Sequence, residues 1–350
     1  MGLPLNGIWK TGLQMPTARF AFACESVGKK IYCAGGSIST SNHRNTTNVL
    51  EVYDTETNYW VPAKPMPESL YMIGSVVVGD KIYCIGGVGP STFSNRIYIY
   101  DTITNNWTLS PYTMPTGRGA LRCSYVDGKI YCAGGIVNAG STSWVFTNTL
   151  EILDLSTGIW TTGSPLPDKL GVGCLHHNNG RLYWISGGHT PSTINSKKTY
   201  VYDIINNIWS EGSNIPSNQI AYASVINDEK IYIISGTNFD TMKDLNLFLS
   251  YDIKNDTYIN LPNAPTMRSS CQGTIIDNKL YVLGGFTNNG LSNNVEIYSE
   301  ENSVIRNEHC CCGSLKLELN IPINNNVEML EKLKELVGVA KGCDSSGCGK

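Results

Sequence analysis

A short phrase that recurs at a nearly even interval constrains this chain more than any other feature. "GKKIYCAGG" at residues 28–36 returns as "GDKIYCIGG" at 79–87 and "DGKIYCAGG" at 127–135, and three looser copies follow. The glycine pairs fall at 35/36, 86/87, 134/135, 187/188 and 284/285, and Gly236 stands alone in the fifth copy. A phrase repeated about every 50 residues is typical of one unit in a repeat architecture. The sequence therefore predicts six similar units.

Each unit is expected to form four antiparallel strands. A turn such as Asp127-Gly128 precedes the phrase and closes a hairpin, because its residues tolerate positive φ. Downstream, an alternating segment carries an aspartate six residues before an aromatic residue, which fixes the register of a second hairpin. These pairs are Asp54 and Trp60, Asp101 and Trp107, Asp154 and Trp160, Asp203 and Trp209, and Asp252 and Tyr258. Radial stacking buries both apolar faces of such sheets, so we predict an all-β, six-bladed propeller.

These features together resemble the kelch repeat over roughly residues 5 to 299. A diglycine ends the second strand, a Tyr-Asp pair lies in the third, a spaced tryptophan lies in the fourth, and a Met-Pro turn follows. The fifth unit departs from this pattern, with Ser235-Gly236 in place of the diglycine and Tyr258 in place of tryptophan. The resemblance implies a kelch-type β-propeller.

The two ends of the repeat region are expected to share the sixth blade. Ile305 lies where the tryptophan of the sixth unit should be, whereas "NGIWKTGLQMPTAR" at residues 6–19 is similar to "NNWTLSPYTMPTGR" at 105–118. Trp9 should therefore supply the outer strand of the last blade. Such closure removes strand edges that would otherwise invite aggregation. We assign residues 1–305 to the propeller.

Composition argues against several partners and compartments. The formal net charge is −3, the pI is about 6.0, and 41% of the 350 residues are hydrophobic. Such a chain can bury a sizeable core, but it offers no basic footprint for nucleic acid. We see neither a secretion signal nor the roughly 18 apolar residues of a membrane span. We expect a cytoplasmic location, with non-classical delivery to a surface or assembly as the alternative.

Three of the six turns between units place an arginine three residues after a proline. These are Arg19, Arg118 and Arg268, and the other turns have Leu70, Leu170 and Gln219. The kelch resemblance implies that these positions lie near the mouth of the central channel. The arginines would then ring one face and bind carboxylates of a partner through bidentate contacts. The alternative is that they cap backbone carbonyls or pair with neighbouring blades.

The loops between the second and third strands carry the other predicted contact residues. The resemblance implies that these loops open onto the same face as the arginine turns. Their candidates are His43, Arg44, Phe93, Trp144, Phe146, His189, Phe239 and Phe286. Aromatic residues among Ser, Thr and Asn are typical of an adaptable recognition surface. The alternative is that some of them fold back over a blade; for Trp144 and Phe146 we favour recognition.

Seven of the twelve cysteines precede residue 306. Cys33, Cys84 and Cys132 share one register with Trp184, Ile233 and Val282, which indicates a buried apolar position. Counting back from the hairpin turns puts Cys24 opposite Cys33 and Cys123 opposite Cys132. Cross-strand disulfides would fit this geometry. Without a secretion signal we expect paired thiols instead.

No catalytic set is visible in the repeat. The five histidines, at 43, 176, 177, 189 and 309, are scattered over different elements, and His176 and His177 lie beside a hairpin turn, where we expect them on the surface. We therefore expect no cofactor and no metal, and we favour binding over catalysis. The kelch resemblance keeps one enzymatic alternative open, a mutarotase-like sugar-processing enzyme that uses the arginines around the channel.

Residues 306–350 differ in composition from the repeat. Alternation predicts a strand at about 314–321, and a shared apolar face predicts a helix at about 327–337. Five cysteines lie in this tail: Cys310, Cys311, Cys312, Cys343 and Cys348. Adjacent cysteines rarely place thiolates around one zinc ion, so we expect covalent cross-links within the tail or between chains. The tail is thus predicted to mediate attachment or self-association.

We therefore predict a non-catalytic binding module that presents its loop face to a protein or a glycan. A Cys-rich α/β tail would attach or oligomerise it. Two alternatives remain at this stage: the mutarotase-like enzyme, and a covalently cross-linked subunit of a structural or surface assembly. Fold alone does not decide among them, because propellers carry unrelated activities.

Overall fold

The computed structural model describes residues 2–138, 144–188, 197–238 and 240–301. The compact unit that contains these strands spans Met1–Glu301. The predicted strand, helix and cysteines of residues 306–350 lie outside the described residues, as do His189, Phe239 and the side chain of Trp144.

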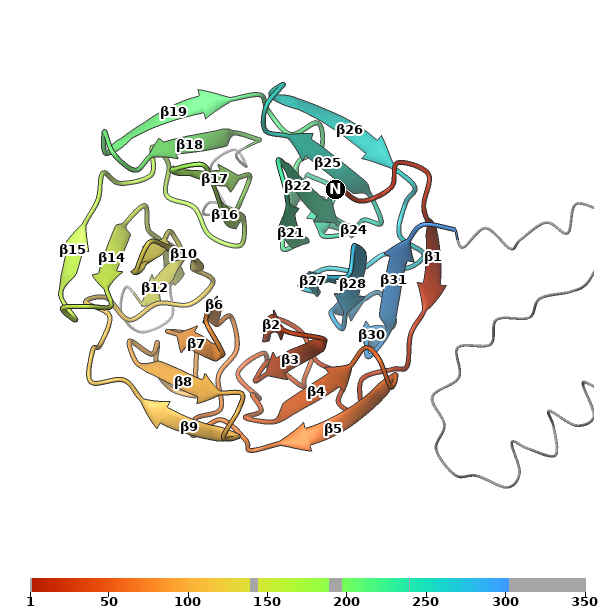
Figure 1. The fold of residues 1–350 in the computed structure, drawn as a ribbon, viewed down its shortest axis with the longest axis horizontal. Coiled ribbons are helices and arrows are strands. Elements are labelled where there is room, and N and C mark those ends of the chain that lie inside the picture. Colours follow the sequence, from red (N-terminus) through yellow and green to blue (C-terminus); the bar gives the residue numbers. More distant parts are fainter. Residues whose placement is uncertain (1, 139–143, 189–196, 239, 302–350) are drawn as a thin grey trace, which may run out of the picture. The chain divides into compact units, whose positions relative to one another are not determined.

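Six four-stranded antiparallel sheets are arranged in a ring (Figure 1). Blade 1 contains β2 (Ala23–Val27), β3 (Lys30–Ala34), β4 (Leu50–Asp54) and β5 (Tyr59–Ala63). Blade 2 contains β6 (Gly74–Val78), β7 (Lys81–Ile85), β8 (Ile97–Asp101) and β9 (Asn106–Leu109). Blade 3 contains β10 (Arg122–Val126), β11 (Lys129–Ala133), β14 (Leu150–Asp154) and β15 (Trp160–Thr162).

The second half of the ring repeats this order. Blade 4 contains β16 (Cys174–Asn178), β17 (Arg181–Ile185), β18 (Thr199–Asp203) and β19 (Ile208–Gly212). Blade 5 contains β21 (Ala223–Asn227), β22 (Lys230–Ile234), β25 (Phe248–Asp252) and β26 (Thr257–Leu261). Blade 6 contains β27 (Gln272–Ile276), β28 (Lys279–Leu283), β31 (Val295–Ser299) and β1 (Ile8–Thr11). The described residues form no helix.

The loops between the second and third strands contain short extra strands: β12 (Ile136–Asn138) with β13 (Trp144–Phe146), β23 (Thr237–Asn238) with β24 (Lys243–Asp244), and β29 (Phe286–Thr287) with β30 (Gly290–Leu291). In blade 5, β20 (Gln219–Ile220) of the preceding inter-blade turn pairs with β23. We call the end of the propeller that carries these loops the loop face. The opposite end, where each innermost strand turns into the second strand, is the hairpin face.

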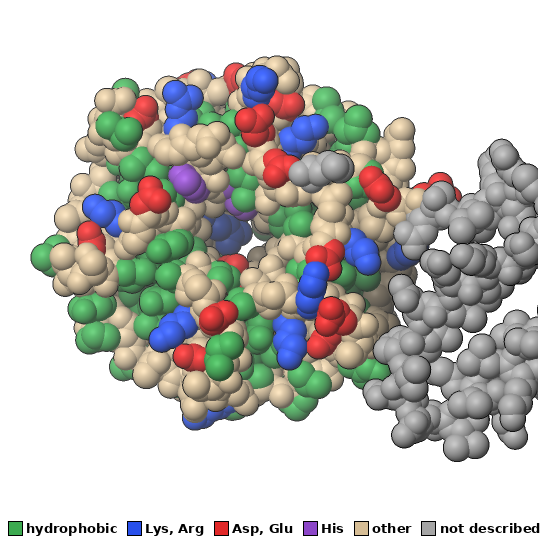
Figure 2. All heavy atoms as spheres, viewed as in Figure 1, with side chains coloured by type: hydrophobic (Ala, Val, Ile, Leu, Met, Phe, Trp, Pro, Cys, Tyr) green, Lys and Arg blue, Asp and Glu red, His purple; other side chains and the backbone are tan. Residues whose placement is uncertain are grey.

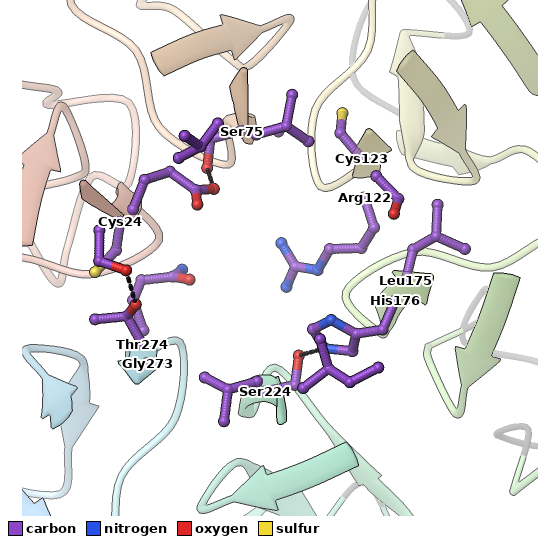
Figure 3. A pocket seen from close by; sticks show the side chains of 18 of the residues that line it. Cys24, Ser75, Arg122, Cys123, Leu175, His176, Ser224, Gly273 and Thr274 are labelled. Atoms are coloured by element: carbon purple, nitrogen blue, oxygen red, sulfur yellow. Dashed lines mark hydrogen bonds between the residues drawn. The ribbon is translucent and has the colours of Figure 1, made fainter. Parts of the chain in front are cut away.

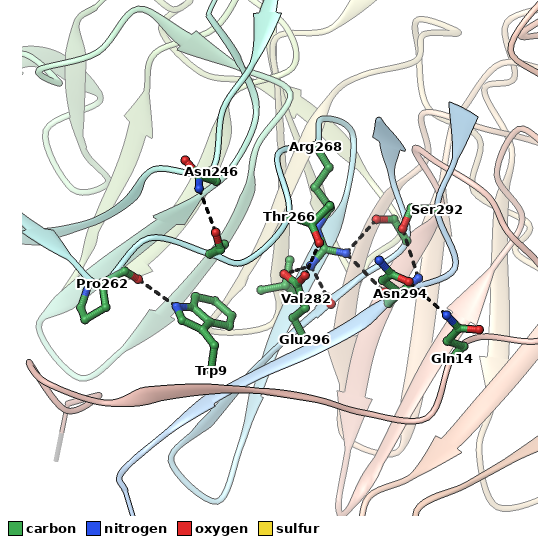
Figure 4. Close-up of polar contacts among 12 residues, drawn as sticks. Trp9, Gln14, Asn246, Pro262, Thr266, Arg268, Val282, Ser292, Asn294 and Glu296 are labelled. Carbon is green, nitrogen blue, oxygen red and sulfur yellow. Dashed lines mark hydrogen bonds and ion pairs between the residues drawn. The ribbon is translucent and has the colours of Figure 1, made fainter. Parts of the chain in front are cut away.

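The N-terminal strand completes blade 6, as residues 6–19 predict. β1 pairs with β31, and Trp9 lies opposite Tyr298 with their ring centroids 5.1 Å apart. The indole Nε1 of Trp9 also donates a hydrogen bond to the carbonyl of Pro262 in blade 5, at 2.8 Å (Figure 4). The tryptophan therefore both fills its own blade and ties that blade to its neighbour.

A second set of contacts joins all six blades at the inner end of the loop face. The residue two positions before each innermost strand donates its N–H to the carbonyl of the equivalent residue in the preceding blade, at 2.6 to 3.2 Å. These residues are Ala21, Met72, Ala120, Val172, Ala221 and Ser270, and the bond from Ala21 to Ser270 completes the circle. Their φ values lie between 50° and 55°, a left-handed conformation that non-glycine residues adopt only when the surroundings hold them in it. We call this set the neck ring.

The diglycine has a direct structural reason. Gly36 donates its N–H to the carbonyl of Leu70 in the next blade at 2.8 Å, and a Cβ on Gly35 would lie 2.6 Å from that same oxygen. In blade 4 the predicted glycine pair at 187/188 is wrong by one residue. The equivalents there are Ser186 and Gly187, with φ of 53° and 131°, so blades 4 and 5 both have a serine at the first position. The following glycine, Gly188, has no such φ.

The aspartate and tryptophan spacing sets the second hairpin, as predicted. In blade 1, Asp54 accepts hydrogen bonds from the backbone N–H groups of Glu56 and Thr57, which holds the turn. Tyr53 then lies opposite Trp60, with ring centroids 5.1 Å apart. The same opposition recurs for Tyr100 with Trp107, Tyr202 with Trp209, and Tyr251 with Tyr258.

Within the described residues there is no helix with the length and apolarity required to cross a bilayer.

Candidate functional site: the loop face and the central channel

The three arginines of the inter-blade turns are buried inside their blades. Arg118 has an exposed fraction of 0%, and its terminal nitrogens donate four hydrogen bonds, to the carbonyls of Gly134, Thr149 and Cys132 and to the Glu151 carboxylate at 3.0 Å. Arg19 with Glu51 and Arg268 with Glu296 repeat this arrangement, the latter drawn in Figure 4. The prediction that these arginines contact a partner is therefore wrong, because a surface ligand cannot reach them. They cap carbonyls of their own blade.

The partner glutamates explain which blades carry an arginine. Glu51, Glu151 and Glu296 occupy one register of the third strand, opposite Cys33, Cys132 and Val282. The blades without arginine have Tyr98, Tyr200 and Leu249 at this position. The Tyr98 and Tyr200 hydroxyls donate to the carboxylates of Glu68 and Asp168 at 2.8 and 2.5 Å. Arginine and glutamate thus occur together in every repeat or not at all, and this sequence signal would have identified the pairs.

Four of the predicted loop residues come together on the loop face. The ring centroid of Phe20 lies 5.3 Å from that of His43 and 6.2 Å from that of Phe286. The Arg44 guanidinium lies 6.0 Å from the ring centroid of Phe93. We call Phe20, His43, Arg44, Tyr71, Phe93 and Phe286 the loop-face cluster. Its members come from blades 6, 1 and 2, which are neighbours only because the ring closes.

The exposure of this cluster is graded. His43 is exposed, Arg44, Phe93 and Phe286 are partly buried, and Phe20 and Tyr71 are buried beneath them. Burial raises the pKa of Tyr71 to about 12, and its hydroxyl has no hydrogen-bond partner among the described residues. Sequence reasoning missed Phe20 and Tyr71, because both lie in the turns before the innermost strands and only the fold places them under the loops.

Phe146 lies apart from the cluster. It lies in β13 opposite Ile136, and its ring comes within 3.0 Å of where a Cβ on Gly171 would be. The side chain therefore covers the neighbouring blade, which is the alternative that the sequence left open for this residue.

The six innermost strands line a cavity of about 460 Å³ at the centre of the ring (Figure 2). Figure 3 shows side chains from different blades converging on it. Glu25 of blade 1, Arg122 of blade 3 and His176 of blade 4 are the principal titratable groups, surrounded by hydroxyls that include Ser75, Ser224 and Thr274. The expectation that His176 lies on the outer surface is wrong, since it forms part of the channel wall.

Cross-blade hydrogen bonds hold these polar groups in place. Ser75 donates to the Glu25 carboxylate at 2.7 Å, Arg122 Nε donates to the Gly173 carbonyl at 2.5 Å, and His176 Nε2 lies 3.0 Å from Ser224 Oγ. A further bond joins Thr274 to Ser26 at 2.8 Å. Each of these bonds links two adjacent blades, so the orientation of the side chains depends on the closed ring.

Burial shifts the protonation of the channel groups. Desolvation raises the pKa of Glu25 to about 7, although the hydrogen bond from Ser75 lowers it. Desolvation and the nearby Arg122 lower the pKa of His176 to about 4. Desolvation also lowers the pKa of Arg122, but an arginine starts so high that it stays charged. At neutral pH the channel therefore holds one fixed positive charge, a neutral imidazole and a carboxyl near its midpoint.

The two ends of the channel differ. The neck ring lines a second cavity of only about 20 Å³ at the loop face, bounded also by Arg122 and Gln272. The large cavity continues along the innermost strands as far as Val77, Tyr125 and His177, next to the hairpin turns. The large cavity therefore reaches the hairpin face, on the side opposite the loop-face cluster.

The cysteine pairs have the predicted register. Cys24 lies opposite Cys33, and Cys123 lies opposite Cys132 with their sulfurs 3.5 Å apart. All seven cysteines of the described residues are free thiols, as we expected for this part of the chain. Cys33, Cys84 and Cys132 are buried, which confirms the predicted apolar register. Over the same residues, no group of three or more His, Cys, Asp or Glu side chains is arranged to hold a metal ion.

Two family models match this chain. The KLHDC2/KLHL20/DRC7 Kelch-repeats domain matches residues 21–215, and the Kelch motif matches residues 267–304. The chain belongs to the kelch-repeat family. The family thus agrees with the ring of six sheets and with the spacing of glycine, aspartate and tryptophan.

Curated kelch proteins resemble this propeller over about half of its length. It is 31% identical over 178 residues to "Kelch repeat and BTB domain-containing protein 12" of Danio rerio, covering 46% of this chain and 28% of that protein. It is 31% identical over 205 residues to "Kelch-like protein terF" of Aspergillus terreus, which covers 53% of this chain and 43% of that protein. An enzyme named "N-(sulfonatooxy)prop-2-enimidothioate sulfolyase", from Thlaspi arvense, is 28% identical over 181 residues, which cover 48% of this chain and 51% of that enzyme. The chain spans about half or less of each relative.

Proposed function

We propose that this kelch propeller is a protein-binding module and that its contact surface is the loop face, centred on the loop-face cluster. The observation that supports this is the convergence of Arg44, Phe93 and Phe286, with the exposed His43, around Phe20. Aromatic and arginine side chains grouped at the centre of a surface are typical of binding hot spots. Loops on a rigid scaffold are also where binding residues concentrate.

A protein suits this surface better than a glycan. The cluster combines partly buried aromatic rings with an arginine whose guanidinium stays near Phe93 and donates to the Pro90 carbonyl at 3.2 Å. Ordered side chains of this kind lose little conformational entropy on binding. A glycan would need several free hydrogen-bonding groups beside a stacking ring, and the interior of the cluster is apolar.

The test is a comparison of captured partners among three forms of the full chain. The double variant Arg44→Ala/Phe93→Ala removes two of the four side chains that lie over the buried Phe20 and Tyr71. The matched control Ile205→Ala removes a comparably apolar side chain, 90% exposed, at the turn between β18 and β19. We expect quantitative affinity capture to give proteins that bind the wild type and Ile205→Ala but lose at least about tenfold with the double variant, as for loss of a hot spot.

The outcome is then checked with the purified partner. Equal binding of that partner to the wild type and to the double variant would contradict the proposal, provided that both unfold at similar temperatures. Saturable binding of a glycan that is lost only in the double variant would reassign the same face to carbohydrate.

The role of residues 306–350 stays a prediction. Attachment or self-association through Cys310, Cys311, Cys312, Cys343 and Cys348 implies covalent multimers on a non-reducing gel that disappear when residues 306–350 are removed. Identical monomer bands for the two forms would contradict it.

A further inference from the structure

Arg122 is partly buried and differs from the three buried arginines of the inter-blade turns. Arg19, Arg118 and Arg268 each pair with a glutamate and cap several carbonyls. Arg122 bonds only through Nε to the carbonyl of Gly173, and no carboxylate of the described residues lies within 4.0 Å of it. Its guanidinium projects from β10 into the open centre of the channel (Figure 3). The two terminal nitrogens are therefore donors aimed at the cavity.

Arg122 is partly withdrawn from bulk water inside the channel and has no anionic partner among the described residues, and proteins pair such charges or use them to hold a ligand. Arg122 is the only Lys or Arg among the residues that line the described cavity, and Glu25 is the only acidic one. Glu25 already accepts the hydroxyl of Ser75 on blade 2 and forms no ion pair with Arg122. The arginine is thus left to a group that enters the channel.

We propose that the channel binds a small organic monocarboxylate, with the terminal nitrogens of Arg122 gripping the carboxylate and the hydroxyls of the other blades contacting its polar substituents. The guanidinium fork matches the planar carboxylate in a bidentate contact. The cavity of about 460 Å³ lies within the range of small-molecule sites. This site is separate from the loop-face cluster and does not depend on it.

The charge of the wall selects a monoanion. The Arg122 guanidinium balances one negative charge on the ligand. The neutral His176 adds no positive charge, and the Glu25 carboxyl would repel a second negative charge on the ligand. A phosphate dianion would leave a charge unpaired inside the channel, which is unfavourable. The hydrogen bonds from Ser75 to Glu25 and between His176 and Ser224 keep the wall in one arrangement before the ligand arrives.

The route of entry follows from the shape of the channel. The cavity at the neck ring has a volume of about 20 Å³, whereas the cavity of about 460 Å³ reaches the hairpin face beside Tyr125. A partner on the loop-face cluster would therefore leave the channel open. The double variant Arg44→Ala/Phe93→Ala should bind the carboxylate as the wild type does.

The experiment uses the purified full chain and defined probes. Lactate, gluconate and benzoate test carboxylates of different size and polarity, and glycerol and glucose are uncharged counterparts. Inorganic phosphate is the dianion when the buffer pH is kept above its second ionisation. Binding is followed by ligand-observed NMR and by calorimetry, in the wild type, in Arg122→Met and in the control Arg96→Met. Arg96 is a good control because its side chain is 54% exposed and pairs with Glu68 on another part of the protein.

We expect at least one carboxylate to bind the wild type and Arg96→Met, and to lose at least about tenfold in affinity with Arg122→Met, the factor typical of losing a hydrogen bond to a charged group. A thermal melt of each variant without ligand shows that it is folded. Absence of binding by all three carboxylates, or equal binding by Arg122→Met, would overturn the proposal. Tighter binding of phosphate than of any carboxylate would overturn the assignment to a monoanion.

Discussion

Arg118 and Arg122 lie four residues apart in the sequence and occupy opposite kinds of environment. Arg118 is 0% exposed, lies inside blade 3 and makes four hydrogen bonds, one of them to Glu151. Arg122 faces the channel and donates to a single carbonyl. An arginine whose terminal nitrogens are all used by its own blade has little left for a ligand. An arginine that is partly buried and only partly bonded has both the donors and the energetic reason to bind one.

Arg118 belongs to a residue pair that recurs in the repeats, whereas Arg122 does not. The blade arginines recur with their glutamates in three repeats, which indicates a shared structural requirement, namely capping the carbonyls near the diglycine. Arg122, Glu25 and His176 each occur once at their position, and no repeat explains them. In a propeller, where six blades satisfy the same packing rules, the residues that break the repeat at the channel wall are the candidates for binding.

The largest effect should follow from breaking a blade pair. Arg118→Leu leaves the Glu151 carboxylate buried without its cation, so we expect the free energy of unfolding to fall by about 3–5 kcal/mol. Chemical denaturation of the wild type and the variant measures this difference. A fall of less than about 1 kcal/mol would show that the pair behaves as a surface salt bridge.

A double variant provides the control for this prediction. Arg118→Leu/Glu151→Tyr installs in blade 3 the residues that blade 4 has at Leu170 and Tyr200. Replacing a buried ion pair with packed side chains is often neutral, so we expect the double variant to recover most of the loss. If it is no more stable than Arg118→Leu, the blade environments are not interchangeable.

A smaller effect of opposite sign is expected in the channel, at Glu25. Burial raises the pKa of this carboxyl to about 7, so the folded protein binds the proton more tightly than the unfolded chain. The stability that this proton contributes is complete below the unfolded pKa and is lost as the pH rises through about 7. Glu25→Gln cannot ionise and should gain about 1–2 kcal/mol over the wild type at about pH 8, after allowance for the water in the channel.

Thermal unfolding of both forms at about pH 4 and about pH 8 checks the Glu25 prediction. The gain should vanish at the lower pH, where the wild-type carboxyl is also neutral. A difference that is equal at the two pH values would mean that packing, and not ionisation, separates the two side chains.

The smallest effect on stability should be that of Arg122→Met. The variant removes one hydrogen bond to the Gly173 carbonyl and one desolvated charge, and these contributions oppose each other. We expect the free energy of unfolding to stay within about 1 kcal/mol of the wild type, against the several kcal/mol of Arg118→Leu. A fall in the free energy of unfolding as large as that of Arg118→Leu would show that Arg122 is a structural arginine, as Arg118 is, and would contradict the difference between them.

Much of the fold could be predicted from the sequence, and the reasons are local. The distance from Asp54 to Trp60 fixes a hairpin because the aspartate caps the turn and the tryptophan meets Tyr53 across the strands. The turn at Asp127-Gly128 places Cys123 opposite Cys132. The similarity of residues 6–19 to 105–118 indicates the pairing of β1 with β31. The error at Gly187 arose because a second glycine follows it. The register of Trp184 with Cys33 already points to Ser186 and Gly187, and the φ angles show that these two residues are the pair.

The candidate site was predicted less well. His43, Arg44, Phe93 and Phe286 were identified as loop residues, but Phe20, whose ring contacts those of His43 and Phe286, was not. The direction of Arg118 was left open between partner contact and carbonyl capping, because a side chain that starts at a turn can point outwards or back into its blade. Its acceptor Glu151 lies 33 residues further along the chain, so only the joint occurrence of arginine and glutamate across the repeats points to it.

By itself the sequence determined the number of units, their strand register and the sharing of the sixth blade, because glycine conformation, turn capping and alternation act within a few residues of one another. Only the tertiary structure decided that the repeated arginines are internal and that Glu25, Arg122 and His176 share one cavity. These three residues come from three blades, and they meet because a closed ring brings every innermost strand to the same axis.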